Sequence, residues 1–162
     1  MANFGEFIGL GGPGLSRPFV FLNMRQPTVK SLIKECDRLM SLFIRQSNAN
    51  QFGQVQCSTC GFSYPWKQIQ NGHFQSRRYY STRWQEKNCA PQCARCNCWG
   101  NTSGSGVAGE SERMAKWLDH KWGEGTADLQ RLAARKFVKL SVPYLQTIKA
   151  ELTEKLKNYE FR

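Results

Sequence analysis

The stretch CSTCGFSYPWKQIQNGHFQSRRYYSTRWQEKNCAPQCARC, residues 57–96, begins and ends with a Cys-x-x-Cys pair. Two residues between paired cysteines let the backbone turn so that both sulfur atoms face one point. Four thiolates in a tetrahedron are a preferred ligand set of structural Zn²⁺. We therefore predict that one zinc ion pins both ends of the 32-residue segment between the pairs. The predicted ligands are Cys57, Cys60, Cys93 and Cys96.

The other cysteines qualify this assignment. Seven is an odd number, and four of the seven fall in Cys-x-x-Cys pairs, which favours a metal site in an intracellular protein over a disulfide framework. Cys89 and Cys98 lie close to the second pair, so either is an alternative ligand, although the spacing favours Cys93 and Cys96. Cys36 falls on a helical apolar stripe, where we expect a small buried side chain.

The charge of the chain indicates its partners. Lysine and arginine total 23 against 12 aspartates and glutamates, a net charge of +11, which is typical of a protein that binds a polyanion such as DNA. Much of this charge lies in and beside the segment between the cysteine pairs, where basic residues alternate with aromatic ones and Glu86 is the single acid. We expect no membrane span, because no run of about 18 apolar residues occurs. The basic residues are Lys67, Arg77, Arg78, Arg83, Lys87 and Arg95.

Helices are predicted on both sides of this segment. Thr28 can cap a helix whose apolar residues from Val29 to Phe43 follow helical spacing. After the segment we expect helices over Glu110–Trp122, closed by Gly123, over Ala127–Val138, and after a Ser141 cap. The last helix is amphipathic, and its apolar face can pack inward or against a second copy of the chain.

The predicted organisation therefore has four parts. Residues 1–27 form an irregular arm rich in Gly, Pro and Phe, and residues 28–53 contain the first helix and a polar turn. Residues 54–101 form the zinc-bound core, with short strands over Gln54–Gln56 and Lys67–Phe74. Residues 102–162 form a helical region that begins with a flexible link over 102–109.

The motifs of residues 54–101 resemble a known nuclease superfamily. The order Cys-x-x-Cys, Gly-His, Asn, Cys-x-x-Cys-Asn is similar to that of the His-Asn-His (ββα-metal) nucleases. The segments CSTCG, NGHFQSR and RWQEKNCAPQCARCN, with Gly100–Asn101 after them, closely resemble the lambdoid phage Rap/NinG recombination endonucleases. The likeness extends over about residues 28–162. It implies an α+β fold in which a zinc-stapled ββα-metal core is flanked by α-helices.

The resemblance also implies roles for individual residues. His73 is expected to be the general base that takes a proton from water, and Asn88 to hold the loop that carries His73. Asn97 is expected to give Mg²⁺ or Mn²⁺ an oxygen ligand. For Glu86 two interpretations stay open, a ligand of this ion or a partner of a neighbouring arginine. Arg77, Arg78, Arg83, Lys87 and Arg95 are the expected DNA contacts.

One position departs from the superfamily pattern. Many of its members place an aspartate or a second histidine immediately before the base, where that side chain binds the metal, whereas this chain has Gly72. The Rap/NinG pattern also has glycine there. The predicted first shell of the catalytic ion is therefore incomplete, with Gln70 and Asn71 as weak additional candidates.

These expectations combine into a function. We predict an intracellular DNA endonuclease, in the cytoplasm of a bacterial host if phage-encoded, that hydrolyses branched recombination DNA such as Holliday junctions and D-loops. Its products would carry a 5′-phosphate and a 3′-hydroxyl. Resolution of a four-way junction needs two related cuts, so we expect a homodimer if that is the task. The alternatives are a non-catalytic zinc-ribbon protein that binds nucleic acid, and a restriction or homing-type nuclease that acts on duplex DNA.

Overall fold

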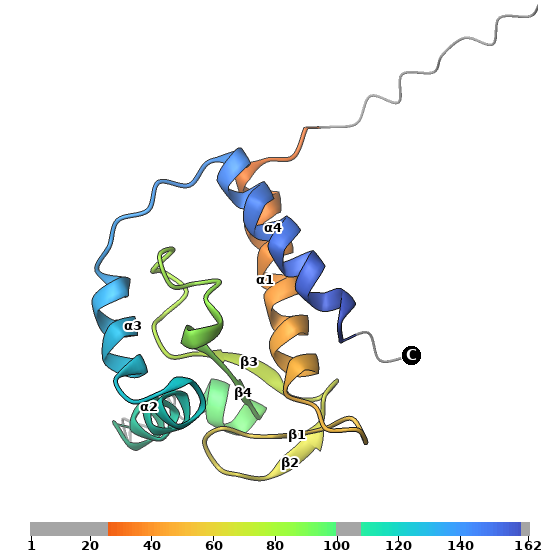
Figure 1. The fold of residues 1–162 in the computed structure, drawn as a ribbon, viewed down its shortest axis with the longest axis vertical. Helices are drawn as coiled ribbons and strands as arrows, with labels where there is room; N and C mark the ends of the chain where they lie inside the picture. Colours follow the sequence, from red (N-terminus) through yellow and green to blue (C-terminus); the bar gives the residue numbers. More distant parts are fainter. Residues whose placement is uncertain (1–25, 100–107, 160–162) are drawn as a thin grey trace, which may run out of the picture.

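The computed structural model describes residues 26–99 and 108–159. Over these ranges the chain is a mixed α+β protein, with helices around two small antiparallel sheets (Figure 1). The predicted α+β class is thus confirmed. The expected arm, residues 1–27, and the expected link, residues 102–109, lie largely outside the described residues. None of the described helices is both long enough and apolar enough to cross a bilayer.

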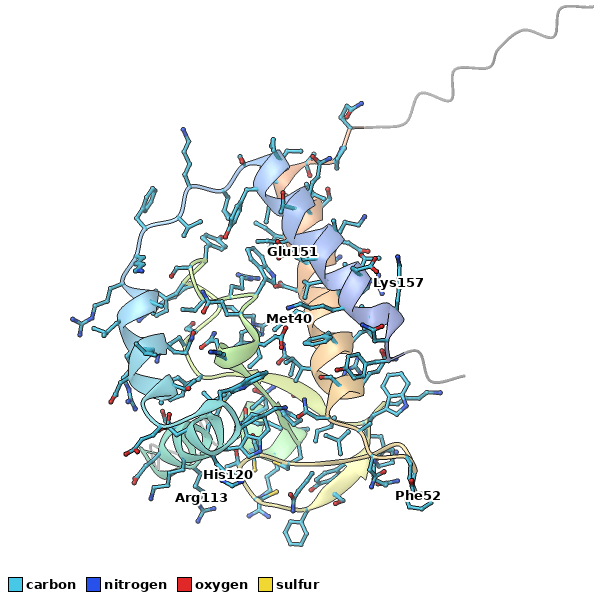
Figure 2. The ribbon with its side chains drawn as sticks, viewed as in Figure 1. Met40, Phe52, Arg113, His120, Glu151 and Lys157 are labelled. Atoms are coloured by element: carbon cyan, nitrogen blue, oxygen red, sulfur yellow. The ribbon has the colours of Figure 1, made fainter. Side chains whose placement is uncertain are left out.

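The first helix, α1 (Val29–Ser47), begins where its cap predicts. The Thr28 side chain accepts a hydrogen bond from the backbone N–H of Ser31, and the Ser31 side chain accepts one from the N–H of Thr28. These reciprocal bonds satisfy two N–H groups that a helix start leaves unpaired. Met40 of α1 is fully buried and points into the interior (Figure 2).

The last helix, α4 (Val142–Lys157), lies alongside α1 (Figure 1). It starts at the predicted cap, because the Ser141 hydroxyl accepts a hydrogen bond from the N–H of Tyr144 at 3.3 Å. Leu145 and Leu152 are buried against the apolar stripe of α1 and form the main core with it. The apolar faces of both helices are therefore used within the chain, so a dimer contact would need a different surface.

Two short antiparallel sheets accompany the helices. β1 (Gln54–Gln56) pairs with β2 (Ser63–Pro65), and β3 (Gln70–His73) pairs with β4 (Cys89–Gln92), both antiparallel. The strand predicted over Lys67–Phe74 is thus shorter than expected. A long loop, residues 74–88, joins β3 to β4 and ends in the 3₁₀ turn η1 (Glu86–Asn88). The helical turn η2 (Arg95–Trp99) follows β4.

Two further helices flank this loop. α2 (Ala108–Trp122) ends at Gly123, whose φ of 105° suits glycine, and α3 (Thr126–Ala134) follows. The prediction that this helix continues to Val138 is wrong. The chain must cross from α3 to the start of α4 (Figure 1), and extended backbone covers about 3.3 Å per residue against about 1.5 Å in a helix.

Candidate metal centre and catalytic loop

The four predicted zinc ligands come together in the structure. The sulfur atoms of Cys57, Cys60, Cys93 and Cys96 all lie within 4.8 Å of one another, and those of Cys60 and Cys93 are 3.9 Å apart. Four sulfurs at the usual Zn–S distance of about 2.3 Å from one ion are separated by roughly 3.8 Å. The cluster therefore has the ligands and the dimensions to hold a metal ion such as zinc.

Local backbone geometry builds this cluster. After Cys57 the chain reverses through Gly61, whose φ of 78° is left-handed, and the N–H of Gly61 donates to the Cys57 carbonyl at 3.0 Å. The N–H of Cys93 donates to the sulfur of Cys57 at 3.3 Å, which joins the two pairs. Val55 and Ile69 pack against the thiols as a second small core. Residues 57 and 93, far apart in the sequence, are thus held at one point.

The thiols of the cluster differ in acidity. Burial raises the pKa of Cys60, and it would do the same for Cys93. For Cys93 the hydrogen bonds from the backbone and thiol of Cys96 outweigh burial and lower the pKa to about 7. A thiol with a lowered pKa loses its proton to an incoming cation more readily, and Cys93 is such a thiol.

Cys89 is not part of the cluster. It is fully buried in the main core with Trp84 and the side chains of α1, and burial raises the pKa of its thiol to about 12. Cys36 is also in this core, where burial raises its pKa to about 11. Both behave as small apolar side chains, so the spacing argument that favoured Cys93 agrees with the packing. The side chain of Cys98 lies outside the described residues.

His73 occupies the last position of β3, opposite Cys89 of β4. Its Nε2 lies 3.1 Å from the carbonyl oxygen of Arg83, which belongs to the 74–88 loop. A carbonyl oxygen only accepts, so Nε2 carries the hydrogen and the lone pair resides on Nδ1. Burial lowers the pKa of His73 to about 4. The ring is therefore a neutral base with a fixed tautomer at neutral pH.

Asn88 ties the loop to its own end. Its side chain is fully buried, and its Oδ1 accepts a hydrogen bond from the N–H of Gln75 at 2.7 Å. Its Nδ2 donates to the carbonyls of Gln75 at 3.1 Å and Thr82 at 3.0 Å. One side chain thus fixes both limbs of the loop that follows His73. Its assignment to the catalytic set remains a prediction.

Asp37 of α1 was not among the predicted site residues. Its carboxylate accepts hydrogen bonds from Arg83 Nε at 2.9 Å, Arg83 Nη2 at 2.6 Å and Trp84 Nε1 at 2.9 Å. Arg83 in turn supplies the carbonyl that binds His73. Asp37 follows Ile33 by four residues and precedes Met40 by three, so an acid interrupts the apolar stripe of α1. That interruption was the available sequence signal, because a half-buried carboxylate needs a partner.

Asn97 lies at the far end of β3 from His73. Its Nδ2 donates to Oε1 of Gln70, the first residue of the strand, at 2.8 Å. Gln70 and His73 are three residues apart in a strand, so their side chains project from opposite faces. The structure therefore joins Asn97 to Gln70, and its role as a metal ligand beside His73 remains a prediction.

The space next to Gly72 is filled by Gln92 of β4. A Cβ on Gly72 would lie 1.9 Å from Gln92 Oε1, too close for any side chain. Gln92 is itself buried, and its Nε2 donates to the Thr59 hydroxyl at 2.6 Å inside the first cysteine turn. The glycine that departs from the superfamily pattern thus accommodates a carboxamide from the neighbouring strand.

Glu86 is paired within the protein. Its carboxylate accepts a hydrogen bond from Lys155 of α4, and the two side chains form a salt bridge. Of the two interpretations left open by the sequence, the structure shows an ion pair, with a lysine as partner in place of the expected arginine.

The five predicted DNA contacts divide into two groups. Arg77, Arg78, Lys87 and Arg95 are exposed and able to meet a phosphate. Arg83 is bound to Asp37, its side chain is only 14% exposed, and its Nη1 donates to the carbonyl of Arg77 at 2.7 Å. The structure thus gives Arg83 an internal structural role, whereas contact with DNA remains a prediction for all five.

Comparisons with protein-family models, with curated proteins and with solved structures found no match for this chain. The function is therefore argued from the site itself.

Proposed function

We propose that this protein is a metal-dependent DNA endonuclease of the His-Asn-His type, with His73 as general base. The observation that carries the proposal is the state of His73. Its Nε2 donates to a carbonyl, which leaves the lone pair on Nδ1, and burial lowers the pKa of the ring to about 4, so Nδ1 is unprotonated at neutral pH. A general base must be unprotonated and fixed in orientation to take a proton from water.

The surroundings of His73 support the same proposal. Strand, loop, strand and helical turn follow one another as β3, residues 74–88, β4 and η2, the order expected of a ββα-metal core. The first Cys-x-x-Cys pair precedes this unit, and the second lies within it, with Cys93 directly after β4 and Cys96 in η2. Exposed Arg77 and Arg78 follow His73 on the loop, where cations can bind the phosphates that flank a scissile bond.

A catalytic Mg²⁺ or Mn²⁺ would be held by neutral oxygen donors. Asn97, the predicted donor, contacts Gln70, whose side chain projects from the face of β3 opposite to His73, and this separation counts against a site in which both groups act on one phosphate. Hard cations accept carboxamide oxygens, but Mg²⁺ usually needs carboxylates or substrate phosphates as well. We propose that the DNA phosphate completes the site. When bound, the ion would stabilise the charge that develops on the phosphate.

One observation favours the non-catalytic zinc-ribbon alternative. Two carboxylates that contact or belong to the 74–88 loop are both occupied, Asp37 by Arg83 and Trp84, and Glu86 by Lys155. A protein that only binds nucleic acid would need neither a metal site nor a free base. The two functions therefore differ in what they predict for His73.

The test compares two histidines. We expect His73→Ala to lower the cleavage rate by about 10²- to 10⁴-fold and to leave DNA affinity unchanged. His73→Gln, which can still donate to the Arg83 carbonyl, should lose cleavage with less effect on stability. His120→Ala is the matched control, since His120 is exposed on α2 (Figure 2). Cleavage by His73→Ala at the wild-type rate would exclude His73 as the general base. DNA binding by the wild-type protein without any cleavage would favour the binding protein.

Substrate class requires a second measurement. We propose branched recombination DNA as the preferred substrate, on the basis of the resemblance to the Rap/NinG endonucleases. Cleavage of matched linear and four-way substrates should be compared at one salt concentration, first with Mg²⁺ and then with a chelator, because phosphate contacts make any basic protein bind DNA. Equal rates on both substrates would instead favour a restriction or homing-type nuclease.

A further inference from the structure

A groove at the edge of the predicted nuclease core lies between the 74–88 loop and the segment that connects α3 to α4. We call it the basic-aromatic groove and define it by Arg78, Tyr79, Arg135, Lys136 and Phe137, which are among the residues that line it. One wall thus belongs to the loop that follows His73, and the other to residues absent from the predicted site.

The groove is positively charged. Arg78, Arg135 and Lys136 are exposed, and none of the described residues that line the groove is acidic. Lys139 adds an exposed cation to the same connecting segment. A concave surface with cations on both walls favours a polyanion, since its charges reinforce one another.

The groove also presents aromatic rings to solvent. Phe137 is 91% exposed, the largest exposed fraction given for any large apolar side chain in the described part of the chain. It lies in the segment that leaves the helix early, after Ala134, so extended backbone carries the ring away from the core. On the opposite wall the guanidinium of Arg78 lies 4.7 Å from the centre of the Tyr79 ring. Exposed rings beside cations are the usual platform on which unpaired bases stack.

We propose that the basic-aromatic groove binds an unpaired segment of DNA, with a base stacked on Phe137 and its phosphates on Arg78, Arg135 and Lys136. This rests on the proposed function and deepens it, because it gives a branch-directed nuclease a surface for the unpaired bases at a branch. The groove is coupled to the predicted base. Arg83 donates to the carbonyl of Arg77, next to Arg78, and its own carbonyl binds His73.

Binding without cleavage tests this proposal. Fluorescence anisotropy is measured on the His73→Ala protein without added Mg²⁺ or Mn²⁺, at one salt concentration, with a blunt duplex and with a duplex that carries a single-stranded tail and the same number of phosphates. Phe137→Ala should weaken binding of the tailed duplex on the order of tenfold and leave the blunt duplex unchanged. Phe137→Trp should retain the preference, and an Arg135→Gln, Lys136→Gln double variant should weaken both.

Phe52→Ala is the matched control, because Phe52 is 77% exposed and lies across the molecule from α3 (Figure 2). Equal effects of Phe52→Ala and Phe137→Ala, or an equal loss on both DNAs, would overturn the proposal. So would a shift from dimer to monomer in sedimentation of Phe137→Ala, which would show that a second copy of the chain covers the ring. Tail binding without cleavage by the wild-type protein would overturn the proposed nuclease function and leave this inference intact.

Discussion

At the scale of single residues, Asp37 has the clearest consequence for the proposed site. It joins α1 to the 74–88 loop through Arg83 and Trp84, and Arg83 supplies the carbonyl that fixes the tautomer of His73. The carboxylate does not touch His73 in these bonds, so it acts by positioning. Burial raises the pKa of Asp37, but the hydrogen bonds from Arg83 and Trp84 and the charge of Arg83 outweigh burial and lower it below the usual value.

We expect Asp37→Asn to lower the free energy of unfolding by about 1–3 kcal/mol, because charge-assisted bonds to a partly buried guanidinium are lost. Urea unfolding measures this loss. A carboxyl with a depressed pKa stabilises the folded state above its unfolded pKa of about 3.9, and this contribution is lost as pH falls through the folded value. The variant should therefore lose less stability than the wild type below about pH 4.

The same variant also tests the positioning role. If Asp37 orients His73, Asp37→Asn should lower the cleavage rate at saturating DNA, and NMR should show a shift of the His73 ring nitrogen signals. Glu35→Gln is the control, since Glu35 pairs with Arg38 on the exposed side of α1. Unchanged His73 signals in Asp37→Asn would restrict Asp37 to a stabilising role.

At the scale of elements, strand β4 links the metal cluster to the 74–88 loop. It begins at Cys89, opposite His73, and ends at Gln92, immediately before Cys93. An ion bound by the cysteines would therefore fix the register of β3 on β4 and with it the position of the imidazole. Gly72 and Gln92 interlock across the same pair of strands.

Removal of one thiol should release the metal. We expect Cys60→Ser to lower the zinc content of purified protein from about one ion to near none, and to lower the unfolding temperature, because structural zinc sites supply folding free energy. Cys89→Ala is the control, since Cys89 lies in the other core. Elemental analysis and thermal unfolding measure both effects. A full zinc complement in Cys60→Ser would contradict the four-cysteine site.

Gly72→Ala tests the interlock of the two strands. The new Cβ would lie 2.6 Å from Gln92 Cδ, so the carboxamide must move and its bond to Thr59 must break. We expect a loss of about 1–3 kcal/mol in the free energy of unfolding. The double variant Gly72→Ala, Gln92→Ala should recover part of this loss in the free energy of unfolding, because the shorter side chain at position 92 leaves room for the new Cβ. Additive losses in urea unfolding would show that the two positions are independent.

At the scale of the whole molecule, the contact between α1 and α4 joins the two ends of the described chain. Leu145 is fully buried in this contact, and Trp84 and Cys89 from the region of the site share the same core. The core therefore supports both the helical frame and the back of the 74–88 loop. Disruption of α4 should therefore disturb the structure of the site, although α4 contributes none of the predicted catalytic residues.

We expect Leu145→Ala to lower the free energy of unfolding by about 2–5 kcal/mol, since removal of buried methyl groups leaves a cavity. Leu129→Ala on α3 is the matched control, because Leu129 is 63% exposed and its loss should cost about 0.5 kcal/mol or less. Urea unfolding followed by circular dichroism measures both. Equal losses would show that α4 does not share a core with α1.

Sequence patterns predicted the features that depend on neighbouring residues and missed those that depend on distant ones. The spacing of the cysteine pairs predicted the thiol cluster, and the caps Thr28 and Ser141 predicted two helix starts, because each pattern acts through neighbouring residues. His73 was also expected within a strand, over Lys67–Phe74, and it lies in β3. The early end of α3 at Ala134 was not, since the distance to α4 decides it.

By itself, the sequence determined the cluster of four thiols, the caps, the apolar stripes and the excess of positive charge, because these follow from residue type and spacing along the chain. Only the tertiary structure decided that Asp37 holds Arg83, that Lys155 binds Glu86 and that Gln92 fills the space at Gly72. The physical reason is that hydrogen bonds and salt bridges depend on distances of a few ångströms between atoms. Residues far apart in the chain reach such distances only when the helices and strands pack together.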